Sequence, residues 1–252
     1  MHYGADKVMC LQRCVLLLEI SAAFLIIFVG AIVQASIGFG LAIIAAPLLF
    51  VLSEDYVPGP ITLVALVLSI LLAVQYRKNL TLKGLGAAIA GRIPGSLAGG
   101  ALLVLADTKS LSLWIGLSVL MAVAMSLSRR QFSPTPGRMA FAGFVSGFMG
   151  TSTSIGGPPM ALLLQHEAAS FIRANLSAFF IVSCLLSLAV QIPAGHMGWS
   201  HLLLTLPLLP AAFLGYLVAE RYSHLVSQER VRGVSLGLCS ICGFLALINY
   251  WR

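Results

Sequence analysis

The sequence predicts an all-α polytopic membrane protein built from two inverted repeats. Of its 252 residues, 59% are hydrophobic and only 9% are charged, whereas a soluble domain has roughly 25% charged residues. The long apolar runs lack the alternating ten-residue pattern of an outer-membrane barrel, so the spanning elements should be α-helices. The lipid bilayer is therefore the first expected partner.

The charged residues, cysteines and histidines exclude several classes of protein. The net charge of +7 comes from Lys and Arg in small groups between apolar segments, which is typical of topology signals and not of nucleic-acid binding. The five cysteines lie in or beside apolar segments, so no secreted disulfide framework is indicated. The histidines form no metal-ligand pattern, and we expect neither a metal nor a cofactor.

Apolar runs between polar breaks predict about ten helical segments. They cover residues 20–36, 41–52, 60–76, 84–105, 111–127, 139–151, 158–165, 174–192, 202–219 and 231–250. The second and the seventh are too short to cross ~30 Å of hydrocarbon at about 1.5 Å per residue. The first run resembles a signal peptide, but the apolar chain continues to residue 52, so we expect a retained membrane segment.

Each short segment follows a glycine-rich break, and an internal repeat relates the two breaks. They are Ser36-Ile37-Gly38-Phe39-Gly40 and Thr151-Ser152-Thr153-Ser154-Ile155-Gly156-Gly157-Pro158-Pro159, with Ser36 and Ser154 118 residues apart. Offsets of 116 and 117 recur in Pro94 with Pro210, Gly99 with Gly215, Gly116 with Gly233 and Ser118 with Ser235. The duplication predicts a first repeat at 1–132, a linker at 133–137 and a second repeat at 138–252.

The distribution of Lys and Arg favours an inverted arrangement of the repeats. If each half crosses the membrane an odd number of times, ten basic residues lie on the cytoplasmic side and four outside. Parallel repeats would place nine basic residues on one side and five on the other. The positive-inside rule therefore prefers inverted halves with both termini outside, and the parallel arrangement stays open.

The breaks point to a substrate site because non-helical backbone at membrane depth must line a cavity or be buried in protein. The prolines after Gly157 suit a helix start, which would leave the N–H groups of Gly156 and Gly157 facing the cavity. A helix N-terminus attracts anions, and two such breaks converge in several secondary transporters. A side chain at Gly156 would fill this space and disfavour a positive φ.

Arg92 is the only basic residue well inside an apolar segment. Because a charge is costly there, Arg92 is a candidate functional residue. It could instead extend to the cytoplasmic surface, and both interpretations stay open. Glycine pairs four residues apart predict close helix packing; they are Gly95 with Gly99, Gly143 with Gly147, and Gly233 with Gly237. The candidate substrate-binding residues are Gln34, Ser36, Gly38, Gly40, Arg92, Ser152, Thr153, Ser154, Gly156 and Gly157.

No carboxylate lies in the middle of an apolar segment, so no carboxylate proton relay is indicated. An inside-negative potential drives an anion outward by ~2.3 kcal/mol per charge per 100 mV without coupling. This favours export. Sodium held by backbone carbonyls would leave no such sequence signature, so import stays open.

The two glycine-rich breaks before proline-bearing hydrophobic stretches resemble those of the sulfite exporter TauE/SafE family, from about residue 19 onward. Phe39 stands where a glycine would be common. The resemblance implies a multi-pass transporter in the bacterial cytoplasmic membrane, not an enzyme, whose partner is a small anion such as sulfite, sulfoacetate or a related sulfonate.

Two other functions and the oligomeric state stay open. Cys239 and Cys242 have a spacing that a membrane thiol oxidoreductase could use, although helix packing explains them as well. A passive anion channel is the other alternative. The sequence does not decide whether the chain forms a homo-oligomer.

Overall fold

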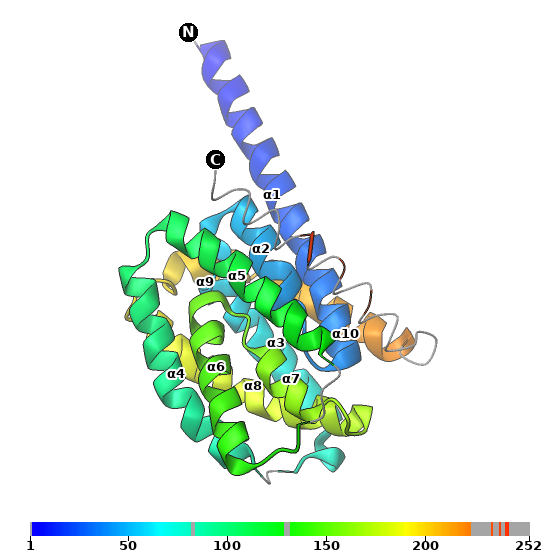
Figure 1. Ribbon diagram of the computed structural model, residues 1–252. Helices are drawn as coiled ribbons and strands as arrows, with labels where there is room; N and C mark the ends of the chain where they lie inside the picture. The colour runs from blue at the N-terminus through cyan, green and yellow to red at the C-terminus, as the bar shows by residue number, and fades with distance from the viewer. Residues whose placement is uncertain are drawn as a thin grey trace.

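The computed structural model describes residues 2–81, 84–128 and 132–222, with the single positions 233, 237, 240 and 241. In these ranges every regular element is a helix (Figure 1). The α-helices are α1 (His2–Ile37), α2 (Leu41–Leu52), α3 (Gly59–Gln75), α4 (Leu85–Leu105), α5 (Thr108–Leu127), α6 (Pro136–Thr153), α7 (Gly157–Leu164), α8 (Ala169–Gln191), α9 (Trp199–Thr205) and α10 (Leu208–Tyr222). Two 3₁₀ turns, η1 (Glu54–Tyr56) and η2 (Arg77–Asn79), flank α3. The all-helical prediction is confirmed for these residues.

Among the residues that the structure describes, six helical stretches are long and apolar enough to cross a membrane. They are Leu17–Ile37, Glu54–Gln75, Leu85–Leu105, Lys109–Leu127, Ala169–Gln191 and Trp199–Tyr222. Helix α2 has 12 residues and α7 has 8, so each is shorter than the ~20 residues that a span needs. These findings confirm a multi-pass membrane protein with two short segments after the breaks.

Several helix boundaries differ from the predicted runs; α8, for example, begins at Ala169 and not at 174. Helix α1 begins at His2 and its first turns project beyond the other helices (Figure 1). Helix α6 begins at Pro136, within the expected linker, because the Thr135 hydroxyl accepts from the Arg138 N–H and proline suits the first turn. The stretch 202–219 is divided between α9 and α10 at Pro207, which lacks the N–H that a continuous helix requires.

The expected segment at 231–250, with Cys239 and Cys242, lies outside the described residues. Gly233 and Gly237 are among the single positions that are described, and no described atom would lie within 4 Å of a Cβ added to either. No contact among the described residues therefore supports the expected role of these two glycines in helix packing.

Helices α4 and α6 pack backbone against backbone, which fixes the centre of the bundle. A Cβ added to Gly95 would overlap the carbonyl oxygen of Phe144, and one added to Gly143 would overlap that of Ala88. A Cβ on Gly147 would lie 2.6 Å from the carbonyl oxygen of Arg92. Packing by the two glycine pairs on these helices is therefore confirmed, and it places Arg92 directly at the α4–α6 contact.

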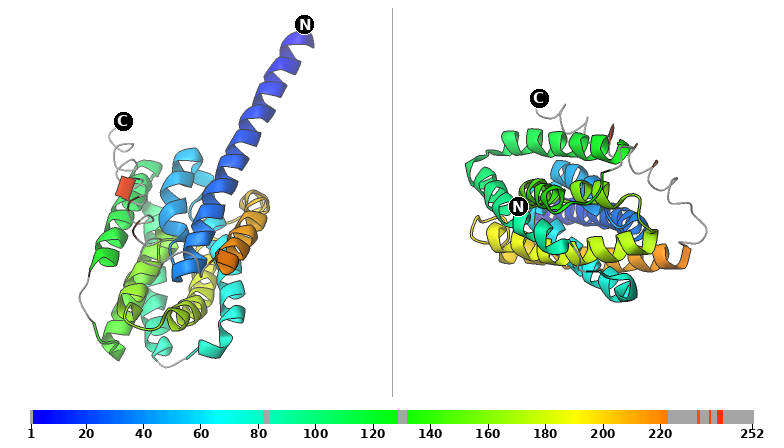
Figure 2. Two further views of the ribbon diagram at one scale, coloured as in Figure 1. Left: turned by 90° about the vertical axis from the view of Figure 1, so that its right-hand side faces the viewer. Right: turned by 60° about the horizontal axis from the view of Figure 1, so that its bottom comes forward.

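The pattern of the main helix contacts is preserved when helices of the first half are exchanged with helices of the second half. Helix α4 packs on α6, α10 packs on α1, and α3 packs on α8. Exchanging α1 with α6, α3 with α8 and α4 with α10 interchanges the first two contacts and leaves the third unchanged. Glycines serve both contacts, because a Cβ on Gly99 would lie 2.5 Å from the Phe148 oxygen and one on Gly215 would lie 2.6 Å from the Phe28 oxygen. In the right-hand view of Figure 2, α5 and α8 lie on opposite sides of α6.

The two breaks are equivalent at a spacing of 116 residues, not 118. Helices α1 and α6 end at Ile37 and Thr153, and the next residues, Gly38 and Ser154, have φ angles of 93° and 64°. The structure therefore pairs Ser154 with Gly38 and not with Ser36. Among the described residues, Ser154 is the only non-glycine residue with a positive φ.

We expect Gly95→Ala to destabilise the protein and Gly86→Ala, on the same helix, to stabilise it. The first substitution forces α4 and α6 apart and should cost about 1 to 3 kcal/mol. A Cβ on Gly86 meets nothing within 4 Å, so alanine there should gain about 0.5 to 1 kcal/mol by helix propensity. Thermal unfolding of the detergent-solubilised variants measures both. Equal effects of the two substitutions would contradict the packing of α4 on α6.

Candidate functional site

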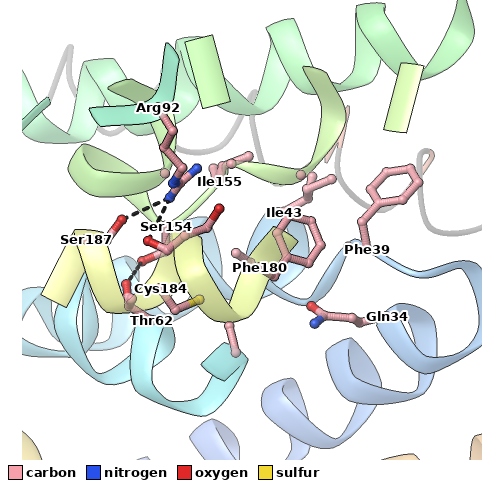
Figure 3. A pocket seen from close by; sticks show the side chains of 17 residues that line it. Gln34, Phe39, Ile43, Thr62, Arg92, Ser154, Ile155, Phe180, Cys184 and Ser187 are labelled. Carbon is pink, nitrogen blue, oxygen red and sulfur yellow. Dashed lines mark hydrogen bonds between the residues drawn. The ribbon is translucent and has the colours of Figure 1, made fainter. Parts of the chain in front are cut away.

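A cavity of ≈ 40 Å³ lies where the two helix breaks meet α3, α4 and α8 (Figure 3). Six of the ten candidate residues line it: Gln34, Gly40, Arg92, Ser154, Gly156 and Gly157. Sequence reasoning did not identify three polar residues that also line it, Thr62, Ser183 and Ser187. None of the lining residues is acidic. The cavity therefore combines one cation with hydroxyl groups and backbone.

Arg92 is buried at one end of this cavity, with 3% of its surface exposed. Its Nη1 donates to the Ser146 hydroxyl at 2.7 Å, and its Nη2 donates to the Ser183 carbonyl at 3.2 Å and to the Ser187 hydroxyl at 3.0 Å. These partners come from α6 and α8. Because the guanidinium is held between helices inside the bundle, the interpretation that Arg92 reaches the membrane surface is wrong.

All partners of the Arg92 guanidinium are electrically neutral. Its ring contact is with Phe179, whose centroid lies 5.5 Å from Cζ. No carboxylate in the described part of the chain pairs with it, and Nε has no hydrogen-bond partner there. An arginine side chain remains charged in proteins, and a buried charge is costly unless it is paired. An anion in the cavity would supply the missing charge.

Ser146 connects Arg92 to the α6–α7 break. Its hydroxyl accepts from Nη1 of Arg92 and donates to the carbonyl of Gly156. A Cβ on Gly156 would lie 3.2 Å from Nη1, and one on Gly150 would lie 2.8 Å from Nη2. A Cβ on Gly156 would also lie 2.9 Å from the Ser146 carbonyl oxygen, so space requires glycine there, whereas a side chain on Gly150 would displace the guanidinium. The φ of Gly156 is −94°, so the expected need for a positive φ does not apply to it.

The N-terminus of α7 provides fewer donors than the sequence suggested. The Gly156 N–H donates to the Ser154 carbonyl at 3.1 Å, so the prediction that it faces the cavity is wrong. Pro158 and Pro159 have no N–H, which leaves Gly157 as the donor in the first turn. Helix α2 has no proline there, so the N–H groups of its first residues, 41–43, lack intrahelical acceptors; residues 42 and 43 line the cavity.

Ser154 attaches the α6–α7 break to α3. Its hydroxyl lies 2.8 Å from the Pro58 carbonyl oxygen and 2.9 Å from the Thr62 hydroxyl. Thr62 also accepts from Nε2 of Gln191 at 3.3 Å. This network holds Ser154 in its positive-φ conformation and fixes one wall of the cavity.

Four candidate residues do not line the cavity. The hydroxyl groups of Ser36, Ser152 and Thr153 donate to carbonyls one turn earlier in their helices, as serine and threonine within helices commonly do. Ser152 also accepts from the indole N–H of Trp114 at 2.9 Å. A Cβ on Gly38 would lie 3.4 Å from the Cα of Arg173, which places Gly38 against α8.

In the described part of the chain, the helical fold, the six stretches long enough to span a membrane and the cationic, acid-free cavity define a polytopic membrane protein. The profile of the sulfite exporter TauE/SafE family matches residues 23–245, and the chain belongs to that family. Members of the family are transporters and not enzymes, so a thiol oxidoreductase is set aside. No curated protein and no solved structure matches the chain.

We expect Gly156→Val to reduce anion transport strongly while Gly86→Val leaves it close to wild type. The valine side chain would displace the Arg92 guanidinium from Ser146, and loss of a charge-assisted hydrogen bond of about 1.5 to 3 kcal/mol lowers the rate by roughly ten- to a hundredfold. Flux into vesicles containing equal amounts of monodisperse protein measures the effect. Wild-type flux in Gly156→Val would show that this contact is unimportant.

Proposed function

We propose that this protein is a secondary transporter that exports a small sulfur oxyanion, sulfite or a related sulfonate, across the bacterial cytoplasmic membrane. The observation that carries this proposal is the buried Arg92, which has hydroxyl and carbonyl partners but no carboxylate among the described residues. The family supplies the expected class of substrate.

The direction of the helices supports inverted repeats. In Figure 1, α1 runs downward from the N-terminus and its counterpart α6 runs upward. The two breaks therefore approach the cavity from opposite directions, as in transporters with inverted repeats. A cytoplasmic C-terminus, measured with reporter fusions at residue 252, would contradict this arrangement.

The positions of basic residues support a cytoplasmic location for the lower end of Figure 1. Turn η2 and the starts of α6 and α8 lie at this end, and they carry Arg77, Lys78, Arg138 and Arg173. The N-terminus lies at the opposite end. By the positive-inside rule, α1 begins outside the cell.

Export requires no coupling ion in this arrangement. An inside-negative potential favours outward movement of an anion by ~2.3 kcal/mol per charge per 100 mV. Because no acidic residue lines the cavity, protonation of a carboxylate there is not needed. A passive channel would use the same potential, but a cavity of ≈ 40 Å³ favours binding of one ion at a time.

Proteoliposomes loaded with sulfite test both the function and the role of Arg92. A negative internal potential should drive protein-dependent efflux that saturates with concentration, and efflux that rises linearly would indicate a channel. Arg92→Gln should raise the half-saturating sulfite concentration roughly ten- to a hundredfold, because a charge-assisted hydrogen bond contributes about 1.5 to 3 kcal/mol. Ser36→Ala is the control. Absence of efflux for every sulfur oxyanion tested would contradict the function, and unchanged affinity in Arg92→Gln would remove Arg92 from the site.

A further inference from the structure

The end of the cavity farthest from Arg92 is closed by two aromatic rings. Phe39 comes from the α1–α2 break and Phe180 from α8, and both line the cavity; Figure 3 shows them across from Arg92 and Ser187. Only 9% of Phe180 is exposed. We call these two side chains the aromatic wall.

The aromatic wall is held in place by α7. A Cβ added to Gly157 would lie 3.1 Å from Cβ of Phe39 and 3.4 Å from Cζ of Phe180. Both rings therefore pack directly against the first residue of α7. Because protein interiors are densely packed and weakly compressible, the rings can retreat only if α7 or its neighbours also move.

The space between Arg92 and the aromatic wall is small. A cavity of ≈ 40 Å³ has room for about three water molecules, since each needs at least about 10 to 15 Å³ by the same measure. This space favours a compact ion such as sulfite over a longer one. Each additional carbon atom would have to displace part of the lining.

The cavity is polar at the Arg92 end, whereas the opposite end has the two rings beside the amide of Gln34 (Figure 3). The hydroxyl groups of Ser146 and Ser187 lie beside the guanidinium. A sulfonate that placed its charged head group there would direct its carbon chain toward Phe39 and Phe180. The aromatic wall would therefore contact the part of an organosulfonate in which these anions differ.

The aromatic wall has no aromatic counterpart in the other half of the protein. At the spacing of 116 residues, Phe39 corresponds to Ile155 and Phe180 corresponds to Val64. Both counterparts are smaller. The helix packing at these positions therefore does not require large rings. We attribute the size of the two rings to their place in the cavity wall.

We propose that Phe39 and Phe180 set the upper size limit of the substrate, so that the protein carries a compact oxyanion such as sulfite and rejects longer sulfonates. This inference rests on the proposed transport function and specifies its substrate. Arg92 binds the anionic head group, and the aromatic wall limits the length of the carbon chain attached to that head group.

Competition by alkanesulfonates tests the wall without changing head group or charge. Efflux of radiolabelled sulfite from proteoliposomes is measured with methanesulfonate, ethanesulfonate and propanesulfonate as inhibitors. In the wild type, inhibitory potency should fall about tenfold or more from methanesulfonate to propanesulfonate. Phe180→Ala and the milder Phe180→Leu should reduce this dependence on length, measured as the ratio of inhibitory potencies against the efflux that each variant retains. The matched control is Phe213→Ala on α10, where the phenylalanine is 47% exposed and does not line the cavity.

Each outcome decides one question. Equal inhibition by all three sulfonates in the wild type would overturn the size limit even if no variant folds. A length dependence that persists in Phe180→Leu, or that disappears equally in Phe213→Ala, would show that the wall is not the filter. If wild-type protein releases no sulfite at all, the proposed function fails, and that result is distinct from a failure of the wall.

Discussion

The structure depends on accommodating one permanently charged guanidinium inside an apolar helical bundle. Removing an ion from water costs several kcal/mol even after the protein relaxes, so Arg92 needs dipoles around it and an anion nearby. The close α4–α6 contact brings Ser146 to Nη1, and α8 supplies Ser183 and Ser187. Gly150 and Gly156 leave room for the guanidinium. Packing, polar contacts and substrate recognition therefore meet at this side chain.

Helices α1 and α6 end 116 residues apart, at Ile37 and Thr153, but the residues at this spacing differ in their chemistry. At the spacing of 116 residues, Arg92 corresponds to Leu208 and Ser146 corresponds to Gly30. The second half of the cavity therefore has no matching cation. The two helix breaks meet around one space, to which only the first half contributes a cation. This asymmetry explains why the duplicated breaks do not give two equivalent half-sites.

Local sequence features predicted most of the fold, whereas the site required information about distant contacts. Apolar runs and prolines determine where helices begin and end, and the isolated charge of Arg92 identified it as a candidate. Ser187 looks like any small residue in an apolar helix, because its contact with Arg92 joins positions 95 residues apart. The prediction for Gly156 failed because Ser154 adopts a positive φ and its carbonyl takes the Gly156 N–H, a conformation that sequence rules assign to glycine.

We propose that a bound anion compensates the charge of Arg92. Thermal unfolding of the purified protein in detergent, measured against sulfite concentration at constant ionic strength, tests it most directly. Binding to the folded state alone should stabilise the wild type by about 2.7 kcal/mol at a hundredfold excess over Kd, and Arg92→Gln should not respond. An equal sulfite-dependent rise in the unfolding temperature of both proteins, or no rise in the wild type at concentrations that saturate transport, would contradict the account.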